Sequence, residues 1–265
     1  MTAIASIGHL TRDVVANGAS RPGGTVFYSA RALAQLDADA RIVASCSALD
    51  RDELVPRLEA FGLPVTWRAS HTTARYSFHY EGDRRIMRQD AVGEPWGAAE
   101  AAAAASEAEW ILVGALNRSD FSPDVLATLA RGGAKLLVDG QGLVRLPELG
   151  PLRTDGNIGS ALEHVSILKL DSEEAETLVG SADPSALQSL GVPEVILTLG
   201  SQGSVVITAD EIAPIPARVV VGTVDPTGAG DTFSAAYLNA RAAGAAPVAA
   251  ADRATVAVAA FLTTG

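Results

Sequence analysis

The sequence reads Asp225-Pro226-Thr227-Gly228-Ala229-Gly230-Asp231, followed by Thr232-Phe233-Ser234-Ala235-Ala236-Tyr237-Leu238, and this is its most informative stretch. Gly228, Ala229 and Gly230 carry almost no side chain, so their backbone N–H groups can close on an anion. A helix that begins near Asp231 points its positive end at the same place. We therefore predict an anion hole at residues 228–230, with Asp231 as the general base that takes the proton of an attacking hydroxyl.

The same residues also fit a plainer structure, a glycine-rich turn from a strand into a helix with Asp231 as its N-terminal cap. The whole run from Asp225 to Leu238 resembles the second signature of the PfkB or ribokinase family of carbohydrate kinases. That resemblance implies ATP-dependent transfer of the γ-phosphoryl group to a hydroxyl of a small sugar or polyol, an inositol-like one included. A Walker-type Gly-x-x-x-x-Gly-Lys-Ser/Thr motif is absent, which excludes a P-loop kinase.

The composition fits one large α/β domain spanning residues 1–265. The net charge of −11 argues against a nucleic-acid partner, because no extended cluster of Lys or Arg is present. A single cysteine, Cys46, excludes an internal disulfide. The chain has neither a signal-peptide pattern nor an apolar run long enough to span a membrane, so we expect a cytoplasmic protein without a membrane partner.

Short apolar runs alternate with helical patterns along the chain, and this order predicts a doubly wound parallel sheet. The expected strands are 3–8, 110–113, 135–138, 166–170, 195–199 and 204–208, and the expected helices are 25–36, 51–61, 122–131, 172–179 and 232–243. In such sheets ligands bind at the carboxyl ends of the strands. Gly8, Gly114, Asp139, residues 169–174 and Gly200 are all expected at that edge.

Residues 66–90 interrupt this alternation. Tyr76 to Tyr80 and Arg84 to Met87, with Gly82 between them, predict a β-hairpin that covers the substrate as a lid. Arg88 or Arg85 on this hairpin is a candidate to close over the site and meet phosphate. A solvated surface arginine is the alternative.

The acceptor side of the site is implied by the family resemblance. Asp13 follows the first expected strand, where the family places an aspartate that contacts sugar hydroxyls. Gly23 and Gly24 before a helix are similar to the family's first motif, and Tyr28 stands near the position where the family usually carries a substrate-contacting asparagine. The link from Asp13 to Gly23 is shorter than in ribokinase-like members, so we expect a reduced lid and a monomer or weak homodimer.

The donor side follows from the same resemblance. Lys169 to Glu176 looks like the family's Asn-x-x-Glu motif, with Asp171 in place of asparagine and Glu174 retained, which implies that Asp171 and Glu174 organise magnesium. An acidic helix N-terminus is the alternative. The resemblance implies donor contacts from Lys169, Thr198, Gly200, Gly203, Thr227 and Thr255, the last on a helix and strand bordering adenine. In some relatives a monovalent cation also binds near Asp225.

Two further polar residues and two rival functions complete the predictions. Asn117 and Gln141 are expected to hydrogen-bond a polyol, in segments that resemble a compact branch of the family with inositol 3-kinase-like proteins. Aromatic residues 27, 28, 76 and 78 suit either stacking on the base of a nucleoside acceptor or core packing, which leaves a nucleoside kinase open. A catalytically silent ligand sensor is the other alternative, although the retained Asp231 argues against it.

Overall fold

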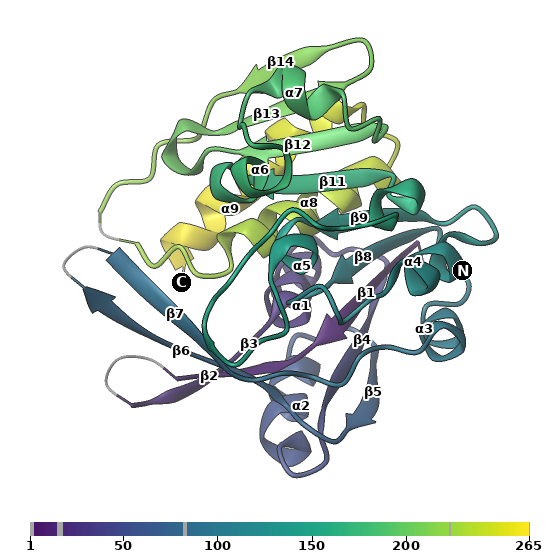
Figure 1. Ribbon diagram of the computed structural model, residues 1–265, viewed down its shortest axis with the longest axis vertical. Helices are drawn as coiled ribbons and strands as arrows, with labels where there is room; N and C mark the ends of the chain where they lie inside the picture. Colours follow the sequence, from purple (N-terminus) through teal and green to yellow (C-terminus); the bar gives the residue numbers. More distant parts are fainter. Residues whose placement is uncertain (1–2, 15–17, 82–83, 223, 265) are drawn as a thin grey trace.

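The computed structural model of the protein describes residues 3–14, 18–81, 84–222 and 224–264, without the side chains of 79–85 and 264. Its large sheet has the order β14-β13-β12-β11-β9-β8-β1-β4-β5, parallel except at β13 and β14 (Figure 1). Its strands are β1 (Ile4–His9), β4 (Ala40–Ser47), β5 (Val65–Ser70), β8 (Trp110–Gly114), β9 (Lys135–Asp139), β11 (Ile167–Asp171), β12 (Glu194–Thr198), β13 (Ser204–Thr208) and β14 (Ile212–Ile215). The predicted doubly wound parallel sheet is confirmed.

Helices cover both faces of this sheet, which explains why its strands read as continuous apolar runs. Ile4 and Ile42 point into one core, whereas Ala5 and Val43 point into the other. One face carries α1 (Thr25–Gln35), α2 (Arg51–Glu59), α8 (Ala229–Ala242) and α9 (Pro247–Thr264), and the other carries α3 (Ala98–Ala104), α4 (Pro123–Ala130), α6 (Ser172–Val179) and α7 (Pro184–Gln188). Short turns of helix follow β9 and β12, namely α5 (Gln141–Val144) and η2 (Gly200–Gln202), and a third, η1 (Ala161–His164), precedes β11.

A second, mixed sheet of five strands lies beside the large one, in the order β10-β7-β6-β2-β3 (Figure 1). Its strands are β2 (Thr11–Val14), β3 (Ser20–Gly23), β6 (Ala74–Glu81), β7 (Arg84–Ala91) and β10 (Gly150–Pro151). The predicted hairpin is present as β6 and β7, paired from Arg75 and Ala91 to Glu81 and Arg84. Gly82, expected in its turn, lies outside the described residues.

Three predictions about the fold need correction. The second sheet is larger than the expected hairpin, because the short link from Asp13 to Gly23 itself supplies β2 and β3. Residues 66–70 do not belong to it, because β5 pairs in parallel with β4 of the large sheet. The C-terminal segment is the single helix α9, without the expected strand.

No helix in the described part of the chain is long and apolar enough to cross a bilayer.

Candidate active site

The glycine turn before α8 has a conformation that its sequence requires. Gly228 is the N-cap at φ 86°, and a Cβ atom there would lie 2.2 Å from a ring carbon of Tyr28. The helix starts at Ala229, so Asp231 is its third residue and the cap itself is glycine. The Ala229 amide donates to the carbonyl of Pro226 at 3.0 Å, which removes one of the three predicted anion-hole donors in this conformation.

Asp231 lies half-buried in the first turn of α8 and hydrogen-bonds Thr25 at the start of α1. Burial raises the pKa of Asp231 to about 6, and the nearby charge of Asp139 adds to the rise. The Thr25 hydrogen bond and the charges of Lys169 and Arg145 oppose it. Asp231 is therefore a carboxylate whose pKa lies close to neutral pH, as a general base requires.

Lys169 brings a buried positive charge to the same place. Its Nζ lies 3.0 Å from Oδ2 of Asp139 and 3.9 Å from Oε2 of Glu174. A Cβ atom on Gly230 would lie 3.3 Å from this Nζ, which puts the ammonium beside the glycine turn. Burial opposes the charge, but Asp139 and Glu174 outweigh it and raise the pKa of Lys169 above its usual range.

The predicted magnesium pair forms a capping box at the start of α6. Oδ1 of Asp171 accepts from the Glu174 amide at 2.8 Å, and Oε2 of Glu174 accepts from the Asp171 amide at 2.9 Å. Burial raises the pKa of Glu174 to about 7, although Lys169 lowers it. No group of three acidic, histidine or cysteine side chains suited to a metal occurs among the described residues. The pair therefore does not fit a direct metal cage, and we derive no step through magnesium.

The other predicted donor contacts differ in position. The Thr198 hydroxyl donates to the carbonyl of Leu170 at 3.1 Å, at the carboxyl end of the sheet. Gly200 begins η2 and Gly203 follows it, in the turn between β12 and β13, with φ values of 57° and 103°. Thr255 is buried in α9, where its hydroxyl donates to the carbonyl of Ala251 at 2.9 Å.

The predicted acceptor residues lie together where the small sheet meets α1. A Cβ atom on Gly23 would lie 2.3 Å from Oδ2 of Asp13, so the carboxylate rests directly on the glycine backbone. Thr11 donates to the other oxygen of Asp13 at 2.7 Å. Gly24 has φ 92°, and a Cβ atom there would lie 2.3 Å from the carbonyl oxygen of His9. Asp13 is thus held at a fixed place near the start of α1.

Arg21 on β3, which the sequence analysis missed, joins the small sheet to the glycine turn. It donates to Oδ2 of Asp225 at 3.0 Å and to the Thr227 hydroxyl at 3.1 Å. Thr227 in turn donates to Oδ1 of Asp225 through its amide and hydroxyl at 2.9 and 2.6 Å. Burial opposes ionisation, but these bonds and the Arg21 charge hold the pKa of Asp225 at about 2. The guanidinium of Arg21 therefore binds Asp225, the residue near which some relatives bind a monovalent cation.

We expect Arg21→Ala to raise the KM for the phosphoryl donor about tenfold, because the Asp225 turn loses its anchor to the small sheet. The unfolding temperature should change little, since a half-exposed ion pair contributes at most about 1 kcal/mol. Steady-state kinetics and thermal melts measure the two effects. Arg218→Ala, which breaks the exposed pair with Asp252, is the control and should leave KM unchanged. An unaltered donor KM for Arg21→Ala would contradict this function of the ion pair.

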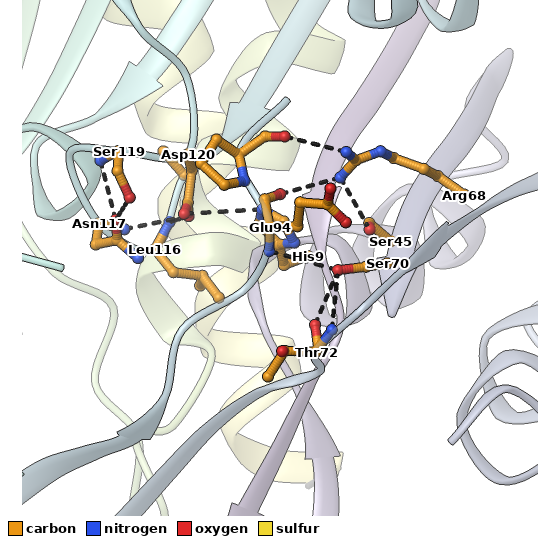
Figure 2. A network of polar contacts seen from close by, with 12 residues as sticks. His9, Ser45, Arg68, Ser70, Thr72, Glu94, Leu116, Asn117, Ser119 and Asp120 are labelled. Atoms are coloured by element: carbon orange, nitrogen blue, oxygen red, sulfur yellow. Dashed lines mark hydrogen bonds and ion pairs between the residues drawn. The ribbon is translucent and has the colours of Figure 1, made fainter. Parts of the chain in front are cut away.

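Asn117, a predicted polyol contact, is 1% exposed and belongs to a buried polar network (Figure 2). Its Oδ1 accepts from the amide and hydroxyl of Ser119 at 2.9 and 2.7 Å. Oδ2 of Asp120 accepts from the amides of Leu116 and Asn117 at 2.7 and 3.2 Å, and His9 lies 3.7 Å from the other oxygen. These hydrogen bonds stabilise the loop after β8, and the Asn117 side-chain oxygen is used within that loop.

The same network ties β1, β4 and β5 to the loop before α3. Arg68 on β5 donates to Ser45 at 3.3 Å and to the carbonyl oxygens of Glu94 and Pro95 at 3.0 Å each (Figure 2). Burial lowers the pKa of His9 and raises the pKa of Asp120. These bonds hold the ends of β4 and β5 against the loop before α3.

The remaining predicted residues lie on two elements. Gln141 at the start of α5 donates through Nε2 to the Thr25 hydroxyl at 3.1 Å and to the Ala115 carbonyl at 3.4 Å. Arg88 on β7 is exposed and pairs with Ser77 and Pro151 in the small sheet. The side chain of Arg85 lies outside the described residues. The structure thus brings Gln141 toward Asp231, but it leaves Arg88 on the surface of the small sheet.

Comparison with known proteins identifies the family. The model of the pfkB family carbohydrate kinases matches residues 1–265, so the chain belongs to that family. It is a phosphotransferase with an alcohol group as acceptor.

Solved structures and one curated relative are similar to this chain. A pyrophosphate-dependent kinase of the ribokinase family, complexed with a pyrophosphate analog and myo-inositol, has TM-score 0.85 and 24% identity, covering 98% of this chain and 94% of that one. Arabidopsis thaliana ribokinase, complexed with ribose and ATP, has TM-score 0.78 and 19% identity, with 99% and 93% covered. A nucleoside kinase of Methanocaldococcus jannaschii is 37% identical over 82 residues, 30% of this chain and 26% of that protein. The match thus spans about a quarter of the nucleoside kinase, whereas the ribokinase-like fold covers nearly the whole chain.

Proposed function

We propose that this protein transfers a phosphoryl group to a hydroxyl of a small sugar or polyol, with Asp231 as the general base. The observation that supports it most strongly is the position of Asp231, a carboxylate with a pKa of about 6 at the N-terminus of α8. Lys169 and the Gly228 turn flank it on one side. Base, cation and helix terminus thus meet at one edge of the sheet.

The reaction uses these groups in sequence. Asp13 holds hydroxyl groups of the acceptor at the small sheet, and one further hydroxyl faces Asp231. The hydroxyl oxygen attacks the donor's terminal phosphorus while the ionised carboxylate accepts the hydroxyl proton, and the bridging P–O bond of the donor breaks, which releases phosphate from pyrophosphate or ADP from ATP. The amides of Gly228 and Gly230, the α8 dipole and the Lys169 ammonium stabilise negative charge on the transferred group. Below about pH 6 Asp231 is protonated, and turnover falls.

Pyrophosphate is our first candidate for the donor, and ATP is the second. The Lys169 ammonium and the backbone amides at the glycine turn suit phosphate. The Thr255 hydroxyl, which was expected near adenine, instead donates to a backbone carbonyl within α9. The similar kinase with a bound pyrophosphate analog supports a donor recognised through phosphates alone, and the similar ribokinase with bound ATP supports the nucleotide.

A small polyol such as an inositol is the acceptor that we favour, with a nucleoside as the second candidate. The bound myo-inositol of the similar kinase supports the first, and the partial match to a nucleoside kinase supports the second. Two of the aromatic side chains considered for base stacking make other contacts. Phe27 contacts Phe61 edge-on at 5.2 Å, and the hydroxyl of the buried Tyr76 donates to Gln89 at 2.9 Å. The Tyr28 ring lies against Gly228 at the site itself. The contacts of Phe27 and Tyr76 favour the polyol.

Phosphorylated product, measured with pyrophosphate and with ATP across inositols, pentoses, hexoses and nucleosides, tests this proposal. We expect turnover with one polyol or sugar class and a higher kcat/KM with pyrophosphate than with ATP. Turnover with nucleosides alone would replace the acceptor. A preference for ATP would replace the donor. Product formation that persists undiminished in Asp231→Asn would overturn the mechanism.

A further inference from the structure

Thr25 and Gln141 form a partly buried chain of hydrogen bonds that ends at Asp231. We infer that they are positioning residues, which hold the Asp231 carboxylate in the orientation that proton transfer needs. This inference rests on the proposed function of Asp231 and adds two residues to that site. Neither residue lies in the glycine-rich stretch from Asp225 to Leu238, and the two are themselves 116 positions apart.

Three elements supply the chain of hydrogen bonds: α5, α1 and α8, which meet near the centre of the fold (Figure 1). Thr25 is the first residue of α1 and is 1% exposed. Gln141 is the first residue of α5, and its Nε2 donates to the Thr25 hydroxyl at 3.1 Å. Thr25 also hydrogen-bonds the side chain of Asp231.

The chemistry of the groups fixes the direction of this chain. The Nε2 group of Gln141 has two hydrogens, and the second points to the carbonyl of Ala115 at 3.4 Å. Because a carbonyl accepts and cannot donate, the amide nitrogen and not its oxygen must face Thr25. The Thr25 hydroxyl therefore accepts from Gln141 and has its single proton left for Asp231. One carboxylate oxygen is held in this way, and the other remains for the substrate proton.

Close backbone packing keeps the donors in place. A Cβ atom on Gly142 would lie 2.2 Å from Cβ of Ala115, so only glycine lets α5 approach the loop after β8 this closely. A Cβ atom on Gly114 would lie 2.9 Å from Cβ of Thr25, which seats the start of α1 directly on the strand end. Gln141 and Thr25 are thus fixed by neighbouring glycines, and they pass that rigidity on to Asp231.

The Thr25 hydrogen bond lowers the pKa of Asp231, against the effects of burial and of the Asp139 charge. Asp139 from β9 raises the pKa of the carboxyl, while Lys169 from β11 and Arg145 after α5 lower it. Tyr28 on α1 is buried and neutral, with a pKa raised to about 12. A hydroxyl that donates to the carboxylate favours its ionised form. Loss of the hydroxyl therefore moves the Asp231 pKa upward and frees the carboxylate to rotate.

Thr25→Val, with Thr25→Ser as its matched control, tests the inference. Valine keeps the shape but removes the hydroxyl, and serine retains it. We expect Thr25→Val to lower kcat about tenfold and to move the acid limb of the kcat–pH profile up by about one pH unit. Thr25→Ser should restore both toward wild type. Gln141→Met should give a smaller change of the same sign, because Thr25 keeps its proton but loses its orientation.

A carbon-13 NMR titration of the Asp231 carboxyl gives a readout that does not need turnover. A higher midpoint in Thr25→Val than in wild type, with Thr25→Ser close to wild type, supports the hydrogen bond. Identical midpoints in all three proteins, with equal kcat profiles, would overturn the inference. If wild-type protein turns over none of the acceptors, the proposed function fails, whereas the titration still decides whether Thr25 holds Asp231. Thermal melts of each variant separate these effects from misfolding.

Discussion

Asp231→Asn is expected to lower kcat by about 10²–10⁴-fold, the usual contribution of a positioned general base. Asparagine has nearly the same volume, so substrate contacts and the α8 cap are retained, and KM should change little. The measurement is product formation under saturating donor and acceptor. The first turn of α8 otherwise stays intact, because its cap is the Gly228 backbone and not the carboxylate.

Whereas kcat falls in Asp231→Asn, the stability of this variant relative to wild type should rise with pH. The folded-state pKa of Asp231 is raised from 3.8 to about 6, so the folded state binds this proton more tightly than the unfolded state. Its contribution to stability is therefore full below pH 3.8 and is lost as the pH rises through 6. Asp231→Asn removes that loss, so its melting temperature relative to wild type should be higher at pH 8 than at pH 5.

Asp124→Asn is the matched control, since Asp124 also lies in the first turn of a helix but is exposed on α4. It should keep wild-type kcat and show no stability gain that grows with pH. If Asp231→Asn retained activity within a few fold of wild type while Asp124→Asn did the same, Asp231 would not be the base. A strong loss of melting temperature in Asp231→Asn would instead indicate a structural function.

The sequence predicted those parts of the site that are contiguous in the chain. The turn from Asp225 to Asp231 was found because glycines, a carboxylate and a helix start occur within a few residues of each other. Most of the large sheet followed from its apolar runs, but β4, β5 and β14 were missed. Ala40–Ser47 was missed although it is buried on both faces, because its arginine and two serines interrupt the apolar pattern that predicts a strand.

Contacts between distant residues were not predictable in this way. Arg21 meets Asp225 across 204 positions, and no local pattern distinguishes Arg21 from an ordinary surface arginine. Asp171 and Glu174 show the reverse problem, because an Asp-x-x-Glu spacing suits both magnesium and a capping box. The structure shows the capping bonds, since both carboxylates accept from backbone amides. Spacing alone does not separate such alternatives.

For single polar residues, the sequence also does not reveal whether the side chain is buried or faces the site. Asn117 was expected to contact substrate because it follows a strand at the correct edge of the sheet. The fold turns its side chain into the interior, where Ser119 occupies its oxygen. Gln141, at the neighbouring strand end, instead faces the site through Thr25. Position at the sheet edge was predictable, but the direction of the side chain depends on packing that the sequence does not reveal.

Lys169→Met should destabilise the protein by about 3–5 kcal/mol at pH 8, the usual cost of leaving a buried charge without its partner. Lys169 is 6% exposed, and its removal leaves the Asp139 and Glu174 carboxylates facing each other in the interior. Chemical denaturation at pH 8 and pH 5.5 measures the loss of unfolding free energy. The loss should be smaller at pH 5.5, because Glu174, with a pKa of about 7, then binds a proton and its repulsion from Asp139 is relieved.

Activity in Lys169→Met separates the stabilising function of this lysine from its proposed contact with phosphate. Lys135→Met is the control. Lys135 is exposed at the start of β9, where its Nζ lies 4.6 Å from the centre of the Trp110 ring. At a temperature where Lys169→Met is still folded, we expect its kcat to fall at least about tenfold, because one positive charge beside the transferred phosphoryl group is lost. Full activity in folded Lys169→Met would assign the ammonium to stability alone. Stability equal to wild type at pH 8 would show that Asp139 and Glu174 do not need it, and the buried charges at this edge of the sheet would then require another partner.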